Sequence, residues 1–260
     1  MIHGELKSAR WKRLLSHALL SGMAVLTMAL TGCATKQNPD PLEHWNRKVF
    51  AFNEGLDRKV IRPVAQGYQA VTPDFFRTGV SNFFGNVKDI WSTTNLFLQG
   101  RFADGTVGVM RVGVNTTLGL GGLLDIATPM RLYRNNGDLG QTLGVWGMGP
   151  GAYIVWPMLG SSTMRDSLGL PADLYFSPTT LSHNAAGNNR LRVLNVVNVR
   201  ANFLGATNLL DDVALDRYAF VRDAYLQRRQ NLIYNGDPPM DDDEGAPPPA
   251  PTEDGASDPH

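Results

Sequence analysis

The chain contains one cysteine in 260 residues, and this cysteine directly follows an N-terminal apolar segment. A single thiol cannot form an internal disulfide or supply a multi-thiolate zinc or iron–sulfur site, so packing and hydrogen bonds must hold the fold. Basic residues precede an apolar run of about a dozen residues from Ala18 to Leu30. A transmembrane helix needs about 20 apolar residues, so this shorter run is typical of a cleaved secretory leader.

The sequence around the cysteine, Leu30-Thr31-Gly32-Cys33, resembles a bacterial lipobox. In a lipobox, diacylglycerol is attached to the cysteine, which becomes the N-terminus after cleavage. We therefore predict that residues 1–32 are a lipoprotein signal peptide and that residues 33–39 are a lipidated linker. Alanine at position 34 favours onward transport to the outer membrane. The alternative is a chance thiol beside an ordinary cleavage site.

The opposite end of the chain is acidic and rich in proline. Residues 236–260 hold seven prolines and eight acidic side chains, without lysine or arginine, and this composition predicts a disordered tail. Without the two ends, residues 36–235 carry 20 basic and 15 acidic side chains, a net charge of about +5. A basic body on a lipid anchor suits an anionic membrane surface. Nucleic acid is not an expected partner of a lipoprotein outside the cytoplasm.

Residues 40–235 are predicted to form an all-α domain. Apolar residues recur in steps of three and four from Leu42 to Val60, which predicts an amphipathic helix. Asp40 is the predicted N-cap, and Glu43 would close a capping box. Phe50 falls off the apolar stripe, so its ring is expected on a flank of the helix.

Four further helices are predicted in this domain. One runs from Thr72 to about Gly100, one follows Asp104, and two span about 188–204 and 212–235. Five glycines between positions 108 and 122 would weaken the third helix in water but would allow close helix packing in lipid. A glycine-rich loop after a short helix is the alternative. No apolar run in the mature chain is long enough to span a bilayer.

The segment 144–160 differs from the helices because glycine and proline recur through it. Gly144, Gly147, Gly149 and Pro157 argue against a good helix there, while the run 153–156 is apolar and extended in character. We expect a short glycine-rich hairpin with an exposed aromatic face.

Residues for catalysis are sparse. His44 and His183 are the histidines of the body, and each is expected at the surface. The sequence lacks Gly-x-Ser-x-Gly, His-Glu-x-x-His and Gly-x-x-x-x-Gly-Lys, so it offers no nucleophile elbow, zinc-protease helix or phosphate loop. We predict that the protein is not an enzyme and binds no metal.

Several motifs are informative together because of their order and spacing. They are Asp40-Pro41-Leu42-Glu43, Asn46-Arg47, Phe50, Asn53, Arg62-Pro63-Val64-Ala65, Asn82-Phe83, Phe97-Leu98-Gln99-Gly100, Asn115-Thr116, Gly121-Gly122, Leu143-Gly144, Tyr153, Pro157, Ser162-Thr163, Arg165-Asp166 and Val221-Arg222-Asp223-Ala224-Tyr225. This set resembles the MlaA (VacJ) family of outer-membrane lipoproteins over about residues 38–235. The order Gly149-Pro150-Gly151-Ala152-Tyr153 departs from the commoner Gly-x-Gly-Pro-Tyr of the family.

The resemblance implies a ring of amphipathic helices embedded in one membrane leaflet around a central channel. Such a ring passively removes mislocalised phospholipids from the outer leaflet of the outer membrane, and so maintains its lipid asymmetry. The implied partners are phospholipids, trimeric porins and a periplasmic phospholipid carrier of an ATP-driven inner-membrane transporter. The implied location is the periplasmic side of the outer membrane. No cofactor is implied beyond the covalent lipid on Cys33.

The resemblance also suggests which residues form the lipid pathway. We predict this role for Asn46, Arg47, Phe50 and Asn53 on the first helix and for Tyr153, Ile154, Val155, Trp156 and Pro157 in the hairpin. Helix packing is the alternative for the first group, and a surface turn is the alternative for the second. Arg165 is a candidate headgroup contact, with an internal ion pair to Asp166 as the alternative.

Two other functions remain open from the sequence. The first is a scaffold lipoprotein that holds porin or envelope complexes without passing lipid. The second is a periplasmic hydrolase, for which the sequence provides no recognisable catalytic residues.

Overall fold

The computed structural model describes residues 38–181, 184–207 and 215–239. Its elements are α2 (Glu43–Leu56), η1 (Asp57–Ile61), α3 (Arg62–Val71), α4 (Asp74–Leu98), α5 (Phe102–Thr117), α6 (Leu139–Val145), β1 (Tyr153–Trp156), β2 (Gly160–Thr163), α7 (Met164–Tyr175), η2 (Pro178–Thr180), α8 (Ala185–Asn202) and α10 (Arg217–Ile233). Helices dominate, so the predicted all-α class is confirmed. The signal peptide, Cys33, His183 and the tail from residue 240 lie outside the described residues.

The first long helix consists of α2, η1 and α3 in continuous succession. The central piece, η1, is a π-helical segment, and Pro63 follows it at the start of α3. Proline has no N–H and crowds the carbonyl four residues earlier, here that of Lys59 in η1. A π segment at this point accommodates the proline without breaking the helix.

The predicted capping box at the start of this helix is wrong. The helix begins at Glu43, its N-cap position is Leu42, and no side chain caps it. Asp40 is buried and uses its carboxylate for tertiary contacts instead. The local sequence pattern for a cap is present. However, the side-chain amide of Asn46 and the hydroxyl of Tyr218 donate to the carboxylate oxygens of Asp40 that a cap would use.

Helices α4 and α5 form an antiparallel pair joined by a tight turn at Gly100, which has a positive φ of 74°. Gly105 and Gly108 of α5 face α4, where a Cβ would collide with Phe97 and Thr93 respectively. The glycines therefore permit the close approach predicted from the sequence. The helix ends at Thr117, and a glycine-rich turn follows it.

A buried arginine fixes the long loop after α5. Arg111 is 2% exposed and binds the carboxylates of Asp89 and Asp125, the hydroxyl of Thr128 and the carbonyl of Leu132. A guanidinium presents five donors in a fixed geometry, so one side chain can satisfy all these acceptors. The loop from 118 to 134 is thereby held against α4 and α5.

The glycine-rich hairpin is confirmed as β1 and β2, which pair antiparallel with Tyr153 opposite Thr163. The predicted exposed aromatic face is confirmed for Trp156, which is 37% exposed, and wrong for Tyr153, which is buried with Val155 on the other face of β1. The expectation of no helix from residue 144 is also corrected, since Gly144 lies inside α6.

Helices α6 and α7 flank the hairpin and were not predicted. Gly140, Gly144 and Gly169 have low helix propensity, but each lies against a neighbouring element where a Cβ would not fit. The close packing that these glycines permit therefore outweighs their low helix propensity. Side-chain caps from Asp138 and Thr163 begin the two helices.

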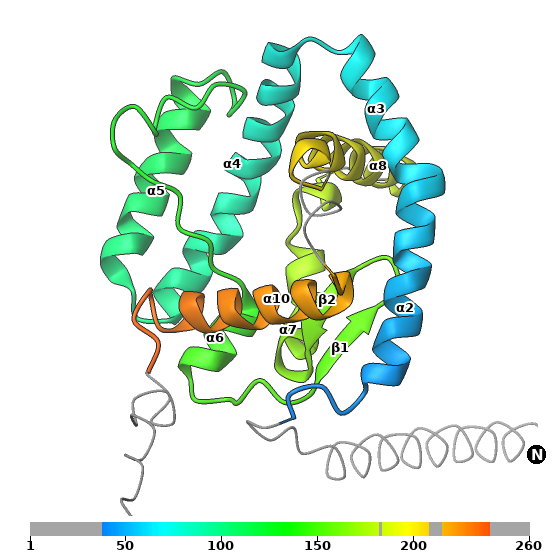
Figure 1. Cartoon of the computed structure of the whole chain (residues 1–260). Coiled ribbons are helices and arrows are strands. Elements are labelled where there is room, and N and C mark those ends of the chain that lie inside the picture. The colour runs from blue at the N-terminus through cyan, green and yellow to red at the C-terminus, as the bar shows by residue number, and fades with distance from the viewer. Residues whose placement is uncertain (1–37, 182–183, 208–214, 240–260) are drawn as a thin grey trace, which may run out of the picture.

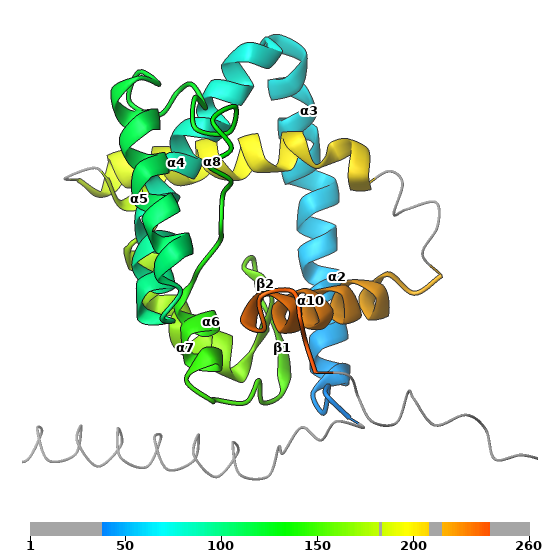
Figure 2. The ribbon, with the colours of Figure 1, turned by 90° about the vertical axis from the view of Figure 1, so that its left-hand side faces the viewer.

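Helices α8 and α10 lie across the ring. They begin at Ala185 and Arg217, and the side chains of Asn184 and Asp216 cap their N-termini. Figure 1 shows α2–α3 on one side and α4–α5 on the other, with α10 crossing in front of the hairpin. Figure 2 shows α8 and α10 running between these two sides at separate levels. The helices thus form the predicted ring.

The ring has little apolar core and many exposed apolar side chains. Its two clusters of buried apolar residues are small. On α2, η1, α3, α4 and α5, the exposed large apolar residues include Trp45, Phe52, Val60, Val64, Phe75, Phe76, Phe102, Val109 and Met110. This density is unusual for a water-exposed surface and marks an interaction surface. None of the described helices is long and apolar enough to cross a membrane.

Candidate functional site

The hairpin is joined to α2 by two asparagine side chains, which we call the hairpin joint. Asn46 is fully buried, donates to the carbonyl of Tyr153 (3.0 Å) and accepts from the N–H of Val155 (2.8 Å). Asn53, two helical turns later, donates to the carbonyl of Trp156 (3.0 Å) and accepts from the N–H of Met158 (2.8 Å). An amide has one donor end and one acceptor end, as a peptide group has. The two side chains therefore pair with the open edge of β1.

The joint continues into a buried cluster of Asp40, Asn46, Tyr218 and Arg222, which we call the Asp40 cluster. Asp40 accepts from Asn46 (2.8 Å) and from the hydroxyl of Tyr218, and it lies 3.6 Å from the guanidinium of Arg222. Burial and the neighbouring carboxylate raise the pKa of Tyr218 well above its usual value. The phenol therefore stays a hydrogen-bond donor. This cluster fastens the N-terminal segment to α10.

Aromatic rings pack around the same cluster. Tyr218 meets the rings of Phe50 and Tyr153 edge to face, with centroid distances of 5.6 and 6.3 Å. The hydroxyl of Tyr153 shares a hydrogen bond with Ser161, and burial raises the pKa of Tyr153. Such contacts fix the hairpin between α2 and α10.

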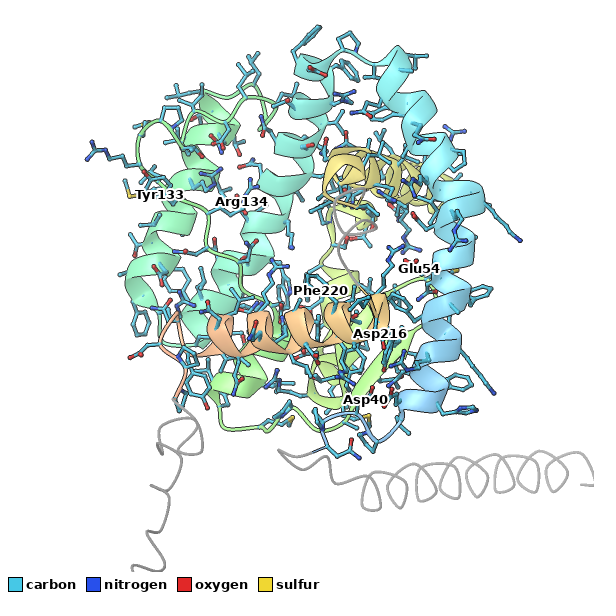
Figure 3. The ribbon with its side chains drawn as sticks, in the orientation of Figure 1. Asp40, Glu54, Tyr133, Arg134, Asp216 and Phe220 are labelled. Atoms are coloured by element: carbon cyan, nitrogen blue, oxygen red, sulfur yellow. The ribbon has the colours of Figure 1, made fainter. Side chains whose placement is uncertain are left out.

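Arg47 joins α2 to the start of α10 at the surface. Its guanidinium binds Asp216 (2.7 and 3.2 Å) and Glu43 (2.7 Å), and it lies 4.5 Å from the centre of the Tyr218 ring. The bonds from Arg47 lower the pKa of Asp216 to about 2. Arg217 and Glu54 form a second ion pair at this point. Figure 3 shows Asp216 at the start of α10, between Glu54 on α2 and Asp40 before α2.

Arg165 is buried, and the structure places it in an internal ion pair. It lies 3.0 Å from Asp166 at the start of α7. The internal ion pair that the sequence offered as the alternative is therefore present, and the headgroup contact of Arg165 stays a prediction. Asp166 in turn binds Arg229 and the hydroxyl of Tyr225, both from α10.

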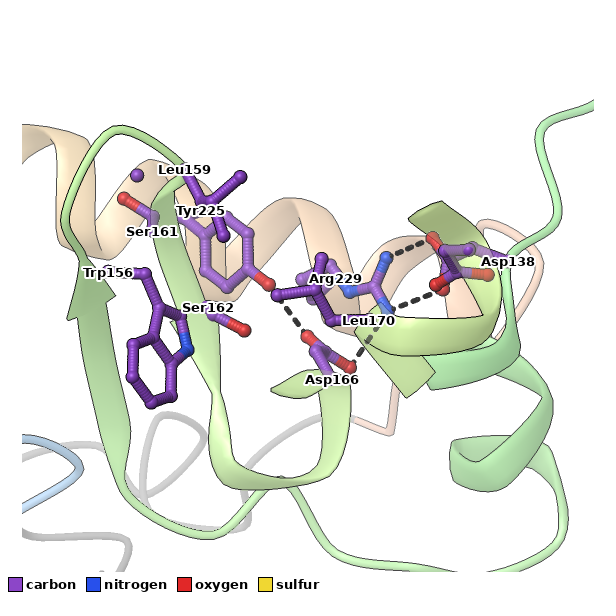
Figure 4. A pocket seen from close by; sticks show the side chains of 11 residues that line it. Asp138, Trp156, Leu159, Ser161, Ser162, Asp166, Leu170, Tyr225 and Arg229 are labelled. Carbon is purple, nitrogen blue, oxygen red and sulfur yellow. Dashed lines mark hydrogen bonds and ion pairs between the residues drawn. The ribbon is translucent and has the colours of Figure 1, made fainter. Parts of the chain in front are cut away.

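A small polar cavity of about 140 Å³ lies beside this network, between the hairpin, α6, α7 and α10. Figure 4 shows Arg229 between Asp138 and Asp166, with Tyr225 directed toward Asp166. Burial alone would raise the pKa of Asp138, but the bonds and charge of Arg229 together with the hydrogen bonds from Gln141 outweigh burial and lower it. Opposite charges thus neutralise each other, and the network offers no activated nucleophile.

The remaining predicted residues divide by exposure. Ile154 is half-buried, Trp156 donates its indole N–H to Ser167, and Pro157 is exposed. Asn46, Tyr153 and Val155 are buried, so in this structure they support the hairpin and do not reach an open surface. The lipid-pathway role of the whole set stays a prediction.

Sequence reasoning missed the function of Asp40, Asp138 and Arg229 in holding the site. Each has a partner far along the chain: Arg229 is 91 positions from Asp138, and Tyr218 is 178 positions from Asp40. The pentapeptide from Val221 to Tyr225 was a signal that α10 matters. The local sequence did not indicate which residues α10 would contact.

In the described part of the chain, the histidine, cysteine, aspartate and glutamate side chains form no group of three suited to a metal ion. His44 is exposed, as expected.

The fold and the joint together define a helical ring protein with many exposed apolar side chains and a hairpin fixed against α2. Comparison with known sequences then gives the family. The family model described as MlaA lipoprotein matches residues 38–232, so the chain belongs to the MlaA lipoprotein family. The resemblance seen in the sequence motifs is confirmed.

Several known proteins are similar to this chain in sequence over most of their length. The chain is 36% identical to the intermembrane phospholipid transport system lipoprotein MlaA of Escherichia coli, over 84% of this chain and 89% of that protein. The protein of the same name in Haemophilus influenzae is 33% identical, over 84% and 90% of the two chains. An uncharacterized protein of Rickettsia bellii is 36% identical, over 78% and 80%.

A solved structure has the same fold. It was described under the heading of a structural basis for maintenance of bacterial outer membrane lipid asymmetry. The match has a TM-score of 0.66 and 36% identity, and it covers 75% of this chain and 98% of that chain.

Proposed function

We propose that this protein is an outer-membrane lipoprotein that passes phospholipids through its helical ring. In this proposal, phospholipids that have strayed into the outer leaflet enter the ring and leave toward the periplasm. The observation that carries the proposal is the family match over residues 38–232, together with the function in the names of the relatives. Conduction of this kind needs apolar and polar walls and no catalytic group.

The exposed apolar residues of the ring support placement within one leaflet. Burying apolar surface stabilises by about 25 cal/mol per Å², so an outer face of this kind favours acyl chains over water. None of the described helices is long and apolar enough to cross a membrane. Lipid on Cys33 would anchor the chain, with the periplasmic side facing the carrier.

The hairpin and α2 are the proposed gate region of the pathway. Asn46 and Asn53 fix the position of the hairpin relative to α2, while Ile154, Trp156 and Pro157 offer the accessible surface. Trimeric porins and a periplasmic carrier of an ATP-driven transporter are the proposed partners. The protein is proposed to act without catalysis and without a cofactor other than its own covalent lipid.

The experiment measures phospholipid in the outer leaflet of the outer membrane in cells that lack this protein, with and without a restored copy. We expect the amount to rise in its absence and to fall again with the wild-type copy. An unchanged amount, with altered porin complexes, would contradict lipid passage and favour the scaffold function.

A further inference from the structure

An open apolar cavity of about 800 Å³ lies away from the hairpin, between α4, the end of α7, η2 and the start of α8. Its apolar wall is formed by Val87, Ile90, Trp91, Tyr175, Phe176 and Leu181. Every residue that lines it is uncharged. Cavities of roughly 300–1,000 Å³ hold small ligands, and an apolar one of this size suits hydrocarbon better than water.

One wall of the cavity is held rigid by an aromatic stack. The rings of Trp91 and Phe176 lie 4.2 Å apart and nearly parallel. The indole N–H of Trp91 donates to Oδ1 of Asp173 (2.7 Å), which also accepts the N–H of Leu139 (3.0 Å). The one polar atom of the indole is therefore satisfied within the protein. Asp173 is thus a positioning residue that ties this wall to the start of α6.

Helical spacing from the lining residues places two cations near the cavity. Arg192 is one helical turn after Asn188 of the lining, on the same face of α8. Lys88 follows Val87 on α4, three positions before Trp91. Both side chains are exposed, and within the described residues neither forms an ion pair. An uncharged wall with a cationic rim is complementary to an apolar chain that carries a phosphate.

We propose that this cavity binds an acyl chain of a phospholipid, with the phosphate beside Arg192 and Lys88. The inference rests on the proposed function for the kind of lipid, and it adds a defined resting place for the lipid outside the hairpin joint. An apolar segment of another protein would lack the phosphate that the rim attracts.

The experiment blocks the cavity through a single introduced thiol. Thr94→Cys places the thiol in the lining, and Thr106→Cys places it on the exposed face of α5. The two threonines are matched, because each is exposed and donates its hydroxyl to the carbonyl four residues earlier. The full-length protein is purified in detergent, labelled with N-phenylmaleimide and given dipalmitoyl phosphatidylglycerol. Wild-type protein treated in the same way reports any labelling of Cys33.

Native mass spectrometry then counts the phosphatidylglycerol that each protein retains. We expect labelled Thr106→Cys to retain as much as the unlabelled wild type, and labelled Thr94→Cys to retain at least tenfold less. Equal retention by the two labelled variants would overturn the proposal, as would a wild type that retains detergent alone.

The part played by Asp173 is tested by conservative rescue. Asp173→Ala removes the acceptor of Trp91 and is expected to lower retention several-fold. Asp173→Asn keeps an oxygen that can accept both N–H groups and is expected to restore it. Low retention in both variants would exclude the positioning role.

Measurement of outer-leaflet phospholipid in cells separates this inference from the function on which it rests. If labelled Thr94→Cys loses the lipid but the wild-type copy does not lower outer-leaflet phospholipid, the cavity stands and the transport function fails. If the wild-type copy acts in cells but blocking the cavity leaves retention unchanged, the function stands and the cavity proposal fails.

Discussion

Asn46 and Asn53 satisfy the backbone of β1 on the side that has no third strand. An unpaired strand edge exposes N–H and C=O groups that other chains can bind. In this protein two side-chain amides occupy part of that edge, at positions seven residues apart on one helix face. The hairpin is thereby held in one position without a larger sheet.

Removing the buried amide of Asn46 should cost more than removing the half-buried amide of Asn53. Asn46→Leu leaves the buried N–H of Val155 without its partner and takes one of its donors from Asp40, so we expect a loss of about 2–4 kcal/mol in the free energy of unfolding. Asn53→Leu is the matched control, with an expected loss of about 1 kcal/mol because water replaces the lost bonds. Denaturant titration of both variants in detergent gives the comparison. Equal losses would mean that the hairpin does not depend on the buried amide.

The carboxylate of Asp125 makes the stability of the loop after α5 dependent on pH. Burial would raise its pKa, but hydrogen bonds from Thr128, Arg111 and Asn115 outweigh burial and lower it to about 2. The folded pKa lies below the unfolded value of about 3.9. The stabilisation is therefore complete above about pH 4 and lost as the pH falls toward 2.

Unfolding measured at steps between pH 5 and pH 2 tests this expectation. The wild type should lose stability over the acid range, and Asp125→Asn should be less stable at pH 5 and lose less on acidification. Parallel curves for the two proteins would show that other carboxylates carry the dependence.

At the scale of elements, the sequence predicted the helices whose apolar pattern is long. Helix α4 was predicted closely, because its apolar stripe runs from Phe76 to Trp91 with clear signals at both ends. Helices α6 and α7 were missed because their glycines, and Pro171 in α7, argue against helix locally. Only their neighbours, such as Arg229 beside Gly140, explain why small residues are needed there.

Two glycines of α5 should respond in opposite ways to the same substitution. A Cβ at Gly108 would collide with Thr93 of α4, whereas a Cβ at Gly113 meets nothing within 4 Å. Gly113→Ala should stabilise by about 0.5–1 kcal/mol through helix propensity, and Gly108→Ala should destabilise by about 1–3 kcal/mol through overpacking. Thermal unfolding of the two variants in one detergent provides the measurement. Stabilisation by both would show that α4 and α5 have room to separate.

At the scale of the whole molecule, the outer surface and the anchor make separate contributions to location. The exposed apolar residues favour a membrane, but they do not select which one. Sorting is expected to depend on the lipid at Cys33. The lipobox predicts this anchor, and the order of the motifs predicted the helical ring. The contacts that close the ring, such as Arg200 with Asp57, connect positions too far apart for a local pattern to show.

Cys33→Ser should therefore keep the protein in membranes but remove it from the outer membrane. We expect an uncleaved precursor in the inner-membrane fraction, because the leader is retained without lipid attachment. Sucrose-gradient separation of the two membranes and immunoblotting give the distribution, with Thr106→Ser as a control that leaves the lipobox intact. The full wild-type amount of Cys33→Ser protein in the outer-membrane fraction would contradict the lipobox.

The π segment at Asp57–Ile61 has a consequence for how this family varies in length. Its hydrogen bonds span five residues where an α-helix spans four, so η1 holds one residue more than the α-helical path requires. Loss of a single residue there would convert the segment to ordinary helix and leave the flanking turns intact. We expect one-residue gaps between relatives to gather at this position, and we expect relatives with the gap to lack a proline equivalent to Pro63.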